Sequence, residues 1–329
     1  MTEEAPTKLT SRKLIMQLVG FAIGLVMLAW CIRTALKGGD WSKLREANPW
    51  LVAGLAGCSL TSLLVNGAVF WLVIRPAHPL KLHHLELLNM VTAVLNYAPV
   101  RLGLIARVAY HIRVDRMSLL LIGGWLAAIG YTMALTMGAV MVVTLLRQTY
   151  DWSWFVWALV LAATLGLCGA LTIGAINAAQ AILGAEWVDR VGKGMHRMLR
   201  QPIALWGAIG LRVVDIGAFT GRMACAAAIL KLSLTGSEIV LLAVTALAMS
   251  LFPLGRVGYR EAGVAFFAQF LGMSGADFDA ARSQLALVES AGEAIVAIPL
   301  GAMALLWYRS RWVNAGKSPD QPAENENIA

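Results

Sequence analysis

The chain has 329 residues, of which 59% are hydrophobic and only 14% are charged. Soluble domains have about a quarter of their residues charged, so this composition excludes a water-soluble globular protein and predicts one all-α, polytopic membrane domain. The formal net charge of +8 does not indicate a nucleic-acid partner, because basic residues that flank membrane segments and set their orientation explain it.

Six apolar runs approach or exceed the roughly 20 residues that a spanning helix needs, the last run being less clean than the others. These runs cover residues 14–32, 50–74, 117–146, 154–176, 203–230 and 283–307. The first is about as long as a full span and lacks a clear cleavage site, so we expect a retained anchor rather than a signal peptide. We expect one domain over 14–307 between a cytoplasmic tail at 1–13 and a disordered cytoplasmic tail at 308–329.

Two further apolar regions are interrupted and do not fit simple spans. Residues 85–111 contain the stretch NYAPVRLG, and residues 239–271 contain FPLGRVGYRE. Each arm of these regions has about 11 to 16 residues and reaches about 16–24 Å as a helix, which is short of the roughly 30 Å hydrocarbon core. We therefore predict two re-entrant helical hairpins, each of which enters the membrane and turns back.

The basic residues predict how the spans and hairpins are oriented. Lys and Arg gather at both termini and in loops 75–84, 107–116 and 177–202, which places these parts in the cytoplasm. The loop 33–49 also carries basic residues, but the distribution of basic residues over all the other loops requires this loop to be external. The first hairpin then opens from the cytoplasm and the second from the opposite side, which is the pattern of an inverted repeat.

Both predicted hairpin tips combine proline, glycine and arginine. Irregular backbone at membrane depth must be buried in protein or face water, and the start of the returning helix offers free N–H groups to an anion. Arginine at such a tip can hold phosphate or carboxylate; alternatively it extends to lipid phosphates or caps carbonyl groups. The tip residues are Pro99, Arg101 and Gly103 in the first hairpin, and Pro253, Gly255, Arg256 and Gly258 in the second.

More charged residues lie inside apolar segments, where unpaired charge is costly. Arg212 and Asp215 are spaced to share a helix face, and they form either a structural ion pair or part of a binding site. Glu289 and Glu293 are proton carriers or partners for arginines, the second role being favoured, and Arg107 is a ligand or merely an interfacial residue. The full set is Arg101, Arg107, Arg212, Arg222, Arg256 and Arg260 against Asp215, Glu261, Glu289 and Glu293. This surplus of positive charge favours an anionic ligand.

Other kinds of site find little support in the sequence. The four cysteines lie in apolar runs, where cysteine acts as a small apolar residue, so we expect no disulfide. His78, His83 and His84 lack metal-ligand spacing with carboxylates and fit a polar interfacial loop better. Because no nucleophile–base arrangement, phosphate-binding loop or dinucleotide fingerprint is visible, we expect no metal, no cofactor and no enzyme.

The two tips resemble those of the lysylphosphatidylglycerol synthase membrane-region family, which are flippase-like integral membrane proteins. The motif residues of the first tip are Asn96, Pro99, Arg101, Gly103 and Arg107; those of the second are Pro253, Gly255, Gly258, Arg260 and Glu261, followed by Ala262. The resemblance covers most of 14–307, and GYREAG is its more specific motif. Two departures are Leu104, where the family usually has Glu, and Arg256, where it often has a small residue.

This resemblance implies movement of a lipid or lipid-linked molecule between membrane leaflets. It adds Asn96 to the candidate binding residues. Some relatives carry a cytosolic aminoacyl-transfer domain, and since the chain ends about twenty residues past its last span, we do not expect a complete synthase of that kind.

The function we expect is that of a flippase for an anionic phospholipid in the bacterial cytoplasmic (inner) membrane. Arginines at the hairpin tips would hold the head group. Two alternatives stay open: an ion- or proton-coupled transporter of a small anionic solute, and a non-transporting partner of an envelope lipid-modifying enzyme. The expected partners are a membrane lipid and, beyond it, a second copy of the chain or such an enzyme.

Overall fold

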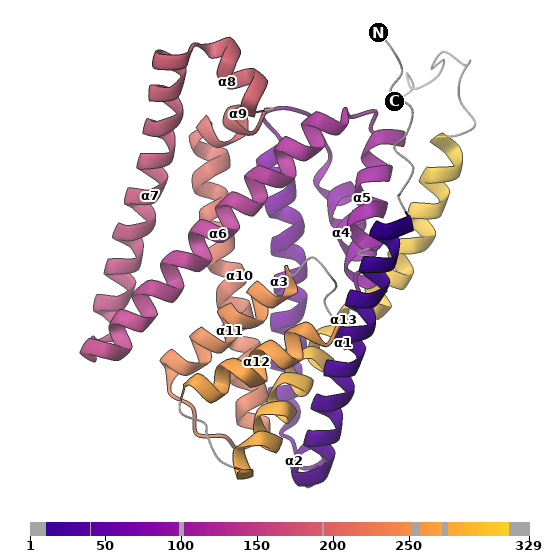
Figure 1. The fold of residues 1–329 in the computed structure, drawn as a ribbon, viewed down its shortest axis with the longest axis vertical. Coiled ribbons are helices and arrows are strands. Elements are labelled where there is room, and N and C mark those ends of the chain that lie inside the picture. The colour runs from indigo at the N-terminus through magenta and orange to yellow at the C-terminus, as the bar shows by residue number, and fades with distance from the viewer. Residues whose placement is uncertain are drawn as a thin grey trace, which may run out of the picture.

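A computed structural model describes residues 11–39, 41–98, 102–192, 194–251, 257–271 and 276–315. Within these ranges the regular structure is entirely α-helical (Figure 1). Six of the described helices are long and apolar enough to cross a membrane, which confirms the six predicted spans and a polytopic membrane protein. They are α1 (Ser11–Gly38), α3 (Pro49–Ile74), α6 (Leu119–Tyr150), α7 (Trp154–Leu183), α10 (Pro202–Ile229) and α13 (Ala276–Ala315).

Local sequence explains where several long helices begin. The side chain of Asn48 accepts a hydrogen bond from the backbone N–H of Trp50, and Ser118 and Ser153 cap α6 and α7 in the same way. Pro49 and Pro202 occupy first-turn positions, where a missing N–H costs nothing.

Shorter helices complete the bundle. The interrupted regions form two pairs of short helices: α4 (Leu82–Leu95) with α5 (Leu102–Arg113), and α11 (Gly236–Ser250) with α12 (Tyr259–Phe270). Figure 1 shows α4 and α5 side by side toward the end of the bundle where α1 begins and α13 ends, and α11 and α12 toward the other end. Three short helices were not predicted from the sequence. They lie in the segments that connect long helices: α2 (Ser42–Arg45) between α1 and α3, and α8 (Ala185–Gly192) and α9 (Met195–Arg200) between α7 and α10.

The last helix differs from expectation, since α13 continues to Ala315 instead of ending at residue 307. Aromatic contacts hold its final turns: Tyr308 stacks on Trp312 at 5.8 Å between ring centroids, and Arg113 of α5 lies 4.5 Å from the centre of the Trp312 ring. The predicted start of the disordered tail at 308 is therefore wrong for the first eight residues of that tail. The expectations for residues 1–10 and 316–329 lie outside the described residues.

The centre of the bundle is the pair α3 and α10, which pack along most of their length. Small residues allow this approach. A Cβ atom added to Gly221 would lie 2.8 Å from the sulfur of Cys58, and one added to Gly54 would lie 3.1 Å from that of Cys225. Close packing of small residues is how membrane helices associate without a hydrophobic driving force. As a consequence, polar residues on the facing surfaces of α3 and α10 come within hydrogen-bonding distance.

The start of α12 is held against α1 through two glycines. Gly258 has a φ of +85°, and a Cβ atom there would lie 1.7 Å from the carbonyl oxygen of Gly24. The hydroxyl of Tyr259 donates to the carbonyl of Gly20 at 2.7 Å, next to this contact. Only glycine satisfies both the backbone conformation and the available space.

Replacing Gly258 by Ala should therefore destabilise the folded protein by at least about 2 kcal/mol, because the strained conformation and the contact with α1 add together. The measurement is thermal unfolding of the purified protein in detergent. Gly217→Ala in α10 is the matched control, since a Cβ atom there meets nothing within 4 Å. Equal unfolding temperatures for the two variants would contradict the assignment.

Candidate functional site

Part of the predicted site lies outside the described residues: Pro99, Arg101, Pro253, Gly255 and Arg256. The structure places the other charged candidates, except Glu261, in two adjoining groups inside the bundle, both of which involve α10.

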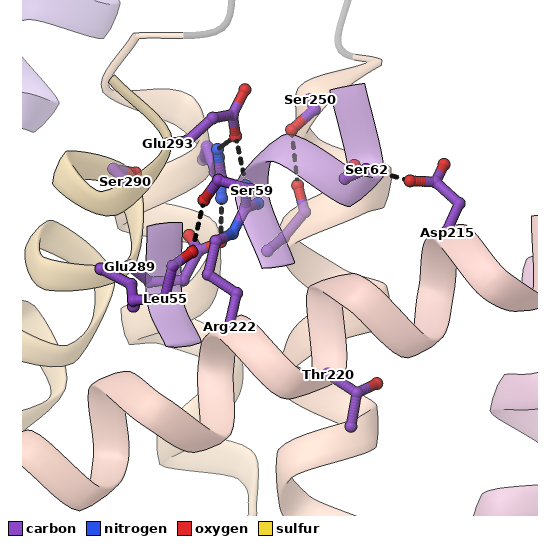
Figure 2. Close-up of polar contacts among 12 residues, drawn as sticks. Leu55, Ser59, Ser62, Asp215, Thr220, Arg222, Ser250, Glu289, Ser290 and Glu293 are labelled. Atoms are coloured by element: carbon purple, nitrogen blue, oxygen red, sulfur yellow. Dashed lines mark hydrogen bonds and ion pairs between the residues drawn. The ribbon is translucent and has the colours of Figure 1, made fainter. Parts of the chain in front are cut away.

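The first group is an arginine–glutamate cluster formed by Arg222 of α10, Arg260 of α12, and Glu289 and Glu293 of α13. Figure 2 shows both glutamates directed from α13 toward Arg222. Arg222 lies 2.5 Å through Nε from Oε1 of Glu289, and 2.9 Å through Nη1 from Oε2 of Glu293. Arg260 lies 2.7 Å through Nη1 from the same oxygen of Glu293, and its Nη2 pairs with Glu289. Each glutamate thus bridges both arginines.

Burial makes this cluster energetically important. Arg222, Arg260 and Glu289 are each at most 1% exposed. The ring of Phe219 lies 4.1 Å from the Arg222 guanidinium and adds a cation–π contact. The two positive and two negative charges cancel, so the cluster stabilises buried arginines rather than supplying a net positive charge. In this structure both glutamates pair with arginines.

The second group is a polar network in which Asp215 and Arg212 of α10 meet α3. Asp215 accepts hydrogen bonds from Ser62 of α3 at 2.6 Å (Figure 2) and from Arg212 at 3.0 Å. Arg212 also donates to the side-chain oxygen of Asn66 on α3 at 3.0 Å. The Arg212–Asp215 ion pair is therefore tied to the neighbouring helix.

The same network continues into the first pair of short helices. Asn66 donates to the side-chain oxygen of Asn89 at 3.4 Å, and Arg107 donates to that oxygen at 2.7 Å. Arg107 also donates to the hydroxyl of Thr92 at 2.7 Å, and its guanidinium lies 3.6 Å from the ring centre of Phe70. Arg107 is 4% exposed, so its side chain lies in the interior of the bundle.

The polar network, together with Glu293 of the arginine–glutamate cluster, lines one cavity of about 390 Å³, here called the central cavity. Two arginines on its wall retain unused hydrogen-bonding capacity. Nη1 of Arg107 and Nε of Arg212 are buried and have no hydrogen-bond partner among the described residues. Unpaired buried donors cost about 1–3 kcal/mol each, so their presence on a cavity wall indicates a place for an acceptor.

The first tip contributes Asn96, Leu104 and a glycine contact to this region. Asn96 and Leu104 line the central cavity. A Cβ atom at Gly103 would lie 2.3 Å from the carbonyl oxygen of Thr92 and 2.4 Å from the side-chain oxygen of Asn96. Glycine at 103 therefore lets α5 approach α4 and keeps Asn96 in position.

Glu261 makes contacts that differ from those expected of a charge balancing the arginines. Its Oε2 accepts a hydrogen bond from the backbone N–H of Gly258 at 2.8 Å, and its Oε1 accepts one from the hydroxyl of Ser290 at 2.6 Å. Glu261 thus caps the first turn of its own helix and ties α12 to α13. The N–H group of Gly258, at the start of the returning helix, was expected to be free for an anion. It is instead bonded to the carboxylate of Glu261.

Charge within the described part is balanced rather than positive. The described candidates comprise four arginines, at 107, 212, 222 and 260, and four acids, at 215, 261, 289 and 293. The expected positive surplus therefore depends on Arg101 and Arg256, which lie outside the described residues.

Several residues of the polar network were not predicted from the sequence. Ser62, Asn66, Asn89 and Thr92 are uncharged residues inside apolar runs, and the available signal was their polarity within those runs. Glu86 of α4 was also not predicted. Its carboxylate interacts with the charge of Arg107. Gly67 of α3 makes room for this carboxylate, since a Cβ atom at position 67 would lie 2.1 Å from it.

No group of three or more potential metal ligands is found in the part of the chain that the structure describes.

Comparison with known families decides the classification. Residues 17–281 match the family described as the lysylphosphatidylglycerol synthase TM region. The chain belongs to this family. No other domain is detected, so the match concerns the membrane region of the family, which is linked to phospholipid modification and flipping. Neither a curated protein nor a solved structure matches the chain.

Replacing Glu289 by Gln should lower the free energy of unfolding by about 3 kcal/mol or more, because two buried arginines then share one carboxylate. Chemical unfolding in detergent measures the loss. Glu46→Gln is the control: Glu46 pairs at 3.6 Å with Lys231, but both side chains are about two-thirds exposed, and we expect a change of no more than about 0.5 kcal/mol.

The double variant Arg222→Met with Glu289→Met should recover much of the stability that Glu289→Gln loses, since Arg260 and Glu293 remain paired. A loss no larger for Glu289→Gln than for Glu46→Gln would contradict the buried cluster.

Proposed function

We propose that this protein moves an anionic phospholipid, or a lipid-linked molecule with a phosphate group, between the leaflets of the bacterial cytoplasmic membrane. The observation that carries this proposal is the central cavity, where Arg107 and Arg212 each keep a buried guanidinium nitrogen without a partner among the described residues. Phosphate oxygens are good acceptors for guanidinium groups. The head group would occupy the central cavity while the acyl chains remain in the lipid.

An arrangement of two inverted halves supports alternating access to this cavity. The succession α1, α3, α4–α5, α6 corresponds to α7, α10, α11–α12, α13, with two long helices, a short pair and a long helix in each half. Packing follows the same correspondence: α4 packs on α13 as α11 packs on α6, and α3 packs on α4 as α10 packs on α11. Binding sites of many transporters lie where such repeats meet.

We interpret the two short pairs as re-entrant hairpins that open to opposite sides. Their helices have 14, 12, 15 and 12 residues, which gives lengths of about 18–23 Å, too short for a span of roughly 30 Å. Each pair lies toward a different end of the bundle (Figure 1). The end of the bundle where α1 begins and α13 ends would face the cytoplasm, because basic residues predominate there. Arg101 and Arg256 are proposed to add to the phosphate site from the tips.

The two groups of charges suggest how the cavity changes state. Glu293 belongs to the arginine–glutamate cluster and also lines the central cavity. A phosphate entering the cavity would compete with Glu293 for Arg222 and Arg260. Exchange of partners keeps every buried charge compensated, which is the condition for movement inside the membrane.

Lipid movement is tested by reconstitution into liposomes that contain fluorescent phosphatidylglycerol, with dithionite quenching measured over time. We expect faster quenching than in protein-free liposomes. Arg107→Gln and Arg212→Gln should each slow it about ten-fold or more, because a charged hydrogen bond to phosphate contributes about 1.5–3 kcal/mol. Arg45→Gln in α2, which removes the same charge at an exposed position, should retain the wild-type rate.

The alternatives predict different results in the same liposomes. A transporter of small anions would accumulate labelled phosphate and leave lipid quenching at the protein-free rate. A non-transporting partner protein would do neither. Either result with folded protein would overturn the lipid proposal.

The orientation of the two hairpins is tested by cysteine labelling in a background without the four native cysteines. A cysteine at Ala77, in the loop that leads into α4, should react with an impermeant reagent only from the cytoplasmic side. A cysteine at Ser233, which precedes α11, should react only from the outside. Labelling of both positions from one side would exclude the inverted arrangement.

A further inference from the structure

A second cavity, here called the side groove, lies between α1, α12 and the beginning of α13, separate from the central cavity. It has a volume of about 530 Å³. Its walls are mostly apolar and include Val26 and Trp30 of α1, Met249 of α11 and Phe266 of α12. Val26, Trp30 and Phe266 are all exposed on the outside of the bundle, so the groove opens sideways toward lipid.

One end of the side groove is polar. Asp279 and Arg282, one turn apart on α13, form an ion pair there. The Asp279 side chain is 54% exposed, whereas that of Arg282 is 8% exposed. Ser283, a residue only 1% exposed, also lines the groove, and its hydroxyl has no hydrogen-bond partner among the described residues. The groove therefore combines an apolar slot with a positive group, a negative group and an unused hydroxyl at one end.

The direction of the side groove matches that of a lipid. The polar end lies at the start of α13, at the end of the bundle away from the start of α1 (Figure 1). Ser290 lies eight residues after Arg282 along α13, or about 12 Å, and its hydroxyl donates a hydrogen bond to Glu261 near the start of α12. A molecule in the groove would thus have its polar part at the membrane surface and its apolar part directed toward the bilayer centre.

We propose that the side groove binds a phospholipid of the outer leaflet whose head group carries both a phosphate and an ammonium group. Arg282 and the Ser283 hydroxyl would hold the phosphate, Asp279 would hold the ammonium group, and one acyl chain would lie along Trp30 and Phe266. The charges at the polar end are balanced, which complements a zwitterionic head group. A purely anionic lipid would gain Arg282 but meet the uncompensated carboxylate of Asp279.

This site does not depend on the proposed transport function; only its assignment to the outer leaflet rests on the orientation proposed above. Its occupant would contact the lipid-facing side of α12, the helix that carries Arg260 into the arginine–glutamate cluster. A lipid bound there would therefore support α12 from outside, whether or not another lipid crosses through the central cavity.

The test uses Trp30 as a local reporter in liposomes. The full-length protein is reconstituted with phosphatidylethanolamine or phosphatidylglycerol that carries brominated acyl chains, which quench tryptophan. The fluorescence of Trp30 is obtained by subtracting the tryptophan fluorescence of the Trp30→Phe variant from that of the wild type. We expect it to be quenched about two- to five-fold more strongly at equal low mole fractions of brominated phosphatidylethanolamine, a preference in the range expected of a partly exposed charge pair.

Two matched controls accompany this measurement. Trp50 is 81% exposed at the start of α3, and its difference signal should be quenched equally by both lipids. Asp279→Asn should abolish the preference at Trp30, whereas Asp151→Asn, which removes an exposed carboxylate elsewhere, should preserve it. Arg212→Gln should also preserve it, which separates this site from the transport cavity.

Equal quenching of Trp30 by the two lipids in the wild type would overturn the proposal. Stronger quenching by phosphatidylglycerol, or a preference that survives Asp279→Asn, would overturn it as well. If the wild-type protein moves no lipid but Trp30 is still quenched more strongly by phosphatidylethanolamine, only the function proposed for the central cavity is contradicted.

Discussion

Arg222 and Glu289, which are each at most 1% exposed, impose the constraint on which the rest of this bundle depends. A charge in hydrocarbon is costly, and removing one partner of a buried pair leaves an uncompensated charge worth about 3–5 kcal/mol. The two residues come from α10 and α13, and Arg260 brings α12 to the same point. Three helices that are distant in sequence are thereby held at a defined height relative to one another.

Helix α10 links this cluster to the central cavity. Its Arg212 and Asp215 belong to the polar network, while Arg222, about 10–15 Å further along the helix, belongs to the arginine–glutamate cluster. Any shift of α10 along its axis would disturb both groups together. The close contacts of Gly221 with Cys58 and of Gly54 with Cys225 oppose such a shift relative to α3, so rearrangement is easier in the short helices than in the α3–α10 centre.

The sequence predicted the parts of this fold that depend on segment length and hydropathy. Six spans and two interrupted regions follow from the lengths of apolar runs, because bilayer thickness sets how long a span must be. The pairing of charges could not be predicted in the same way: Asp215 and Ser62 are 153 positions apart, and periodicity says which residues share one helix face but not which helices meet. Asn66 and Asn89 were missed because a single amide in an apolar run resembles ordinary helix packing.

The contrast between the two groups explains where movement has to occur. In the arginine–glutamate cluster, each carboxylate is shared by two arginines, and the charges cancel without a ligand. In the polar network, Arg107 donates hydrogen bonds to an amide oxygen and a hydroxyl, which are neutral acceptors and weaker than a carboxylate. The carboxylate of Glu86 also interacts with its charge, but this one acid is fewer than the two that pair with Arg222. An arriving anion would therefore improve the surroundings of Arg107 more than those of Arg222. Entry at the α4–α5 side of the central cavity would come first, and the arginine–glutamate cluster would respond only when the anion reaches Glu293.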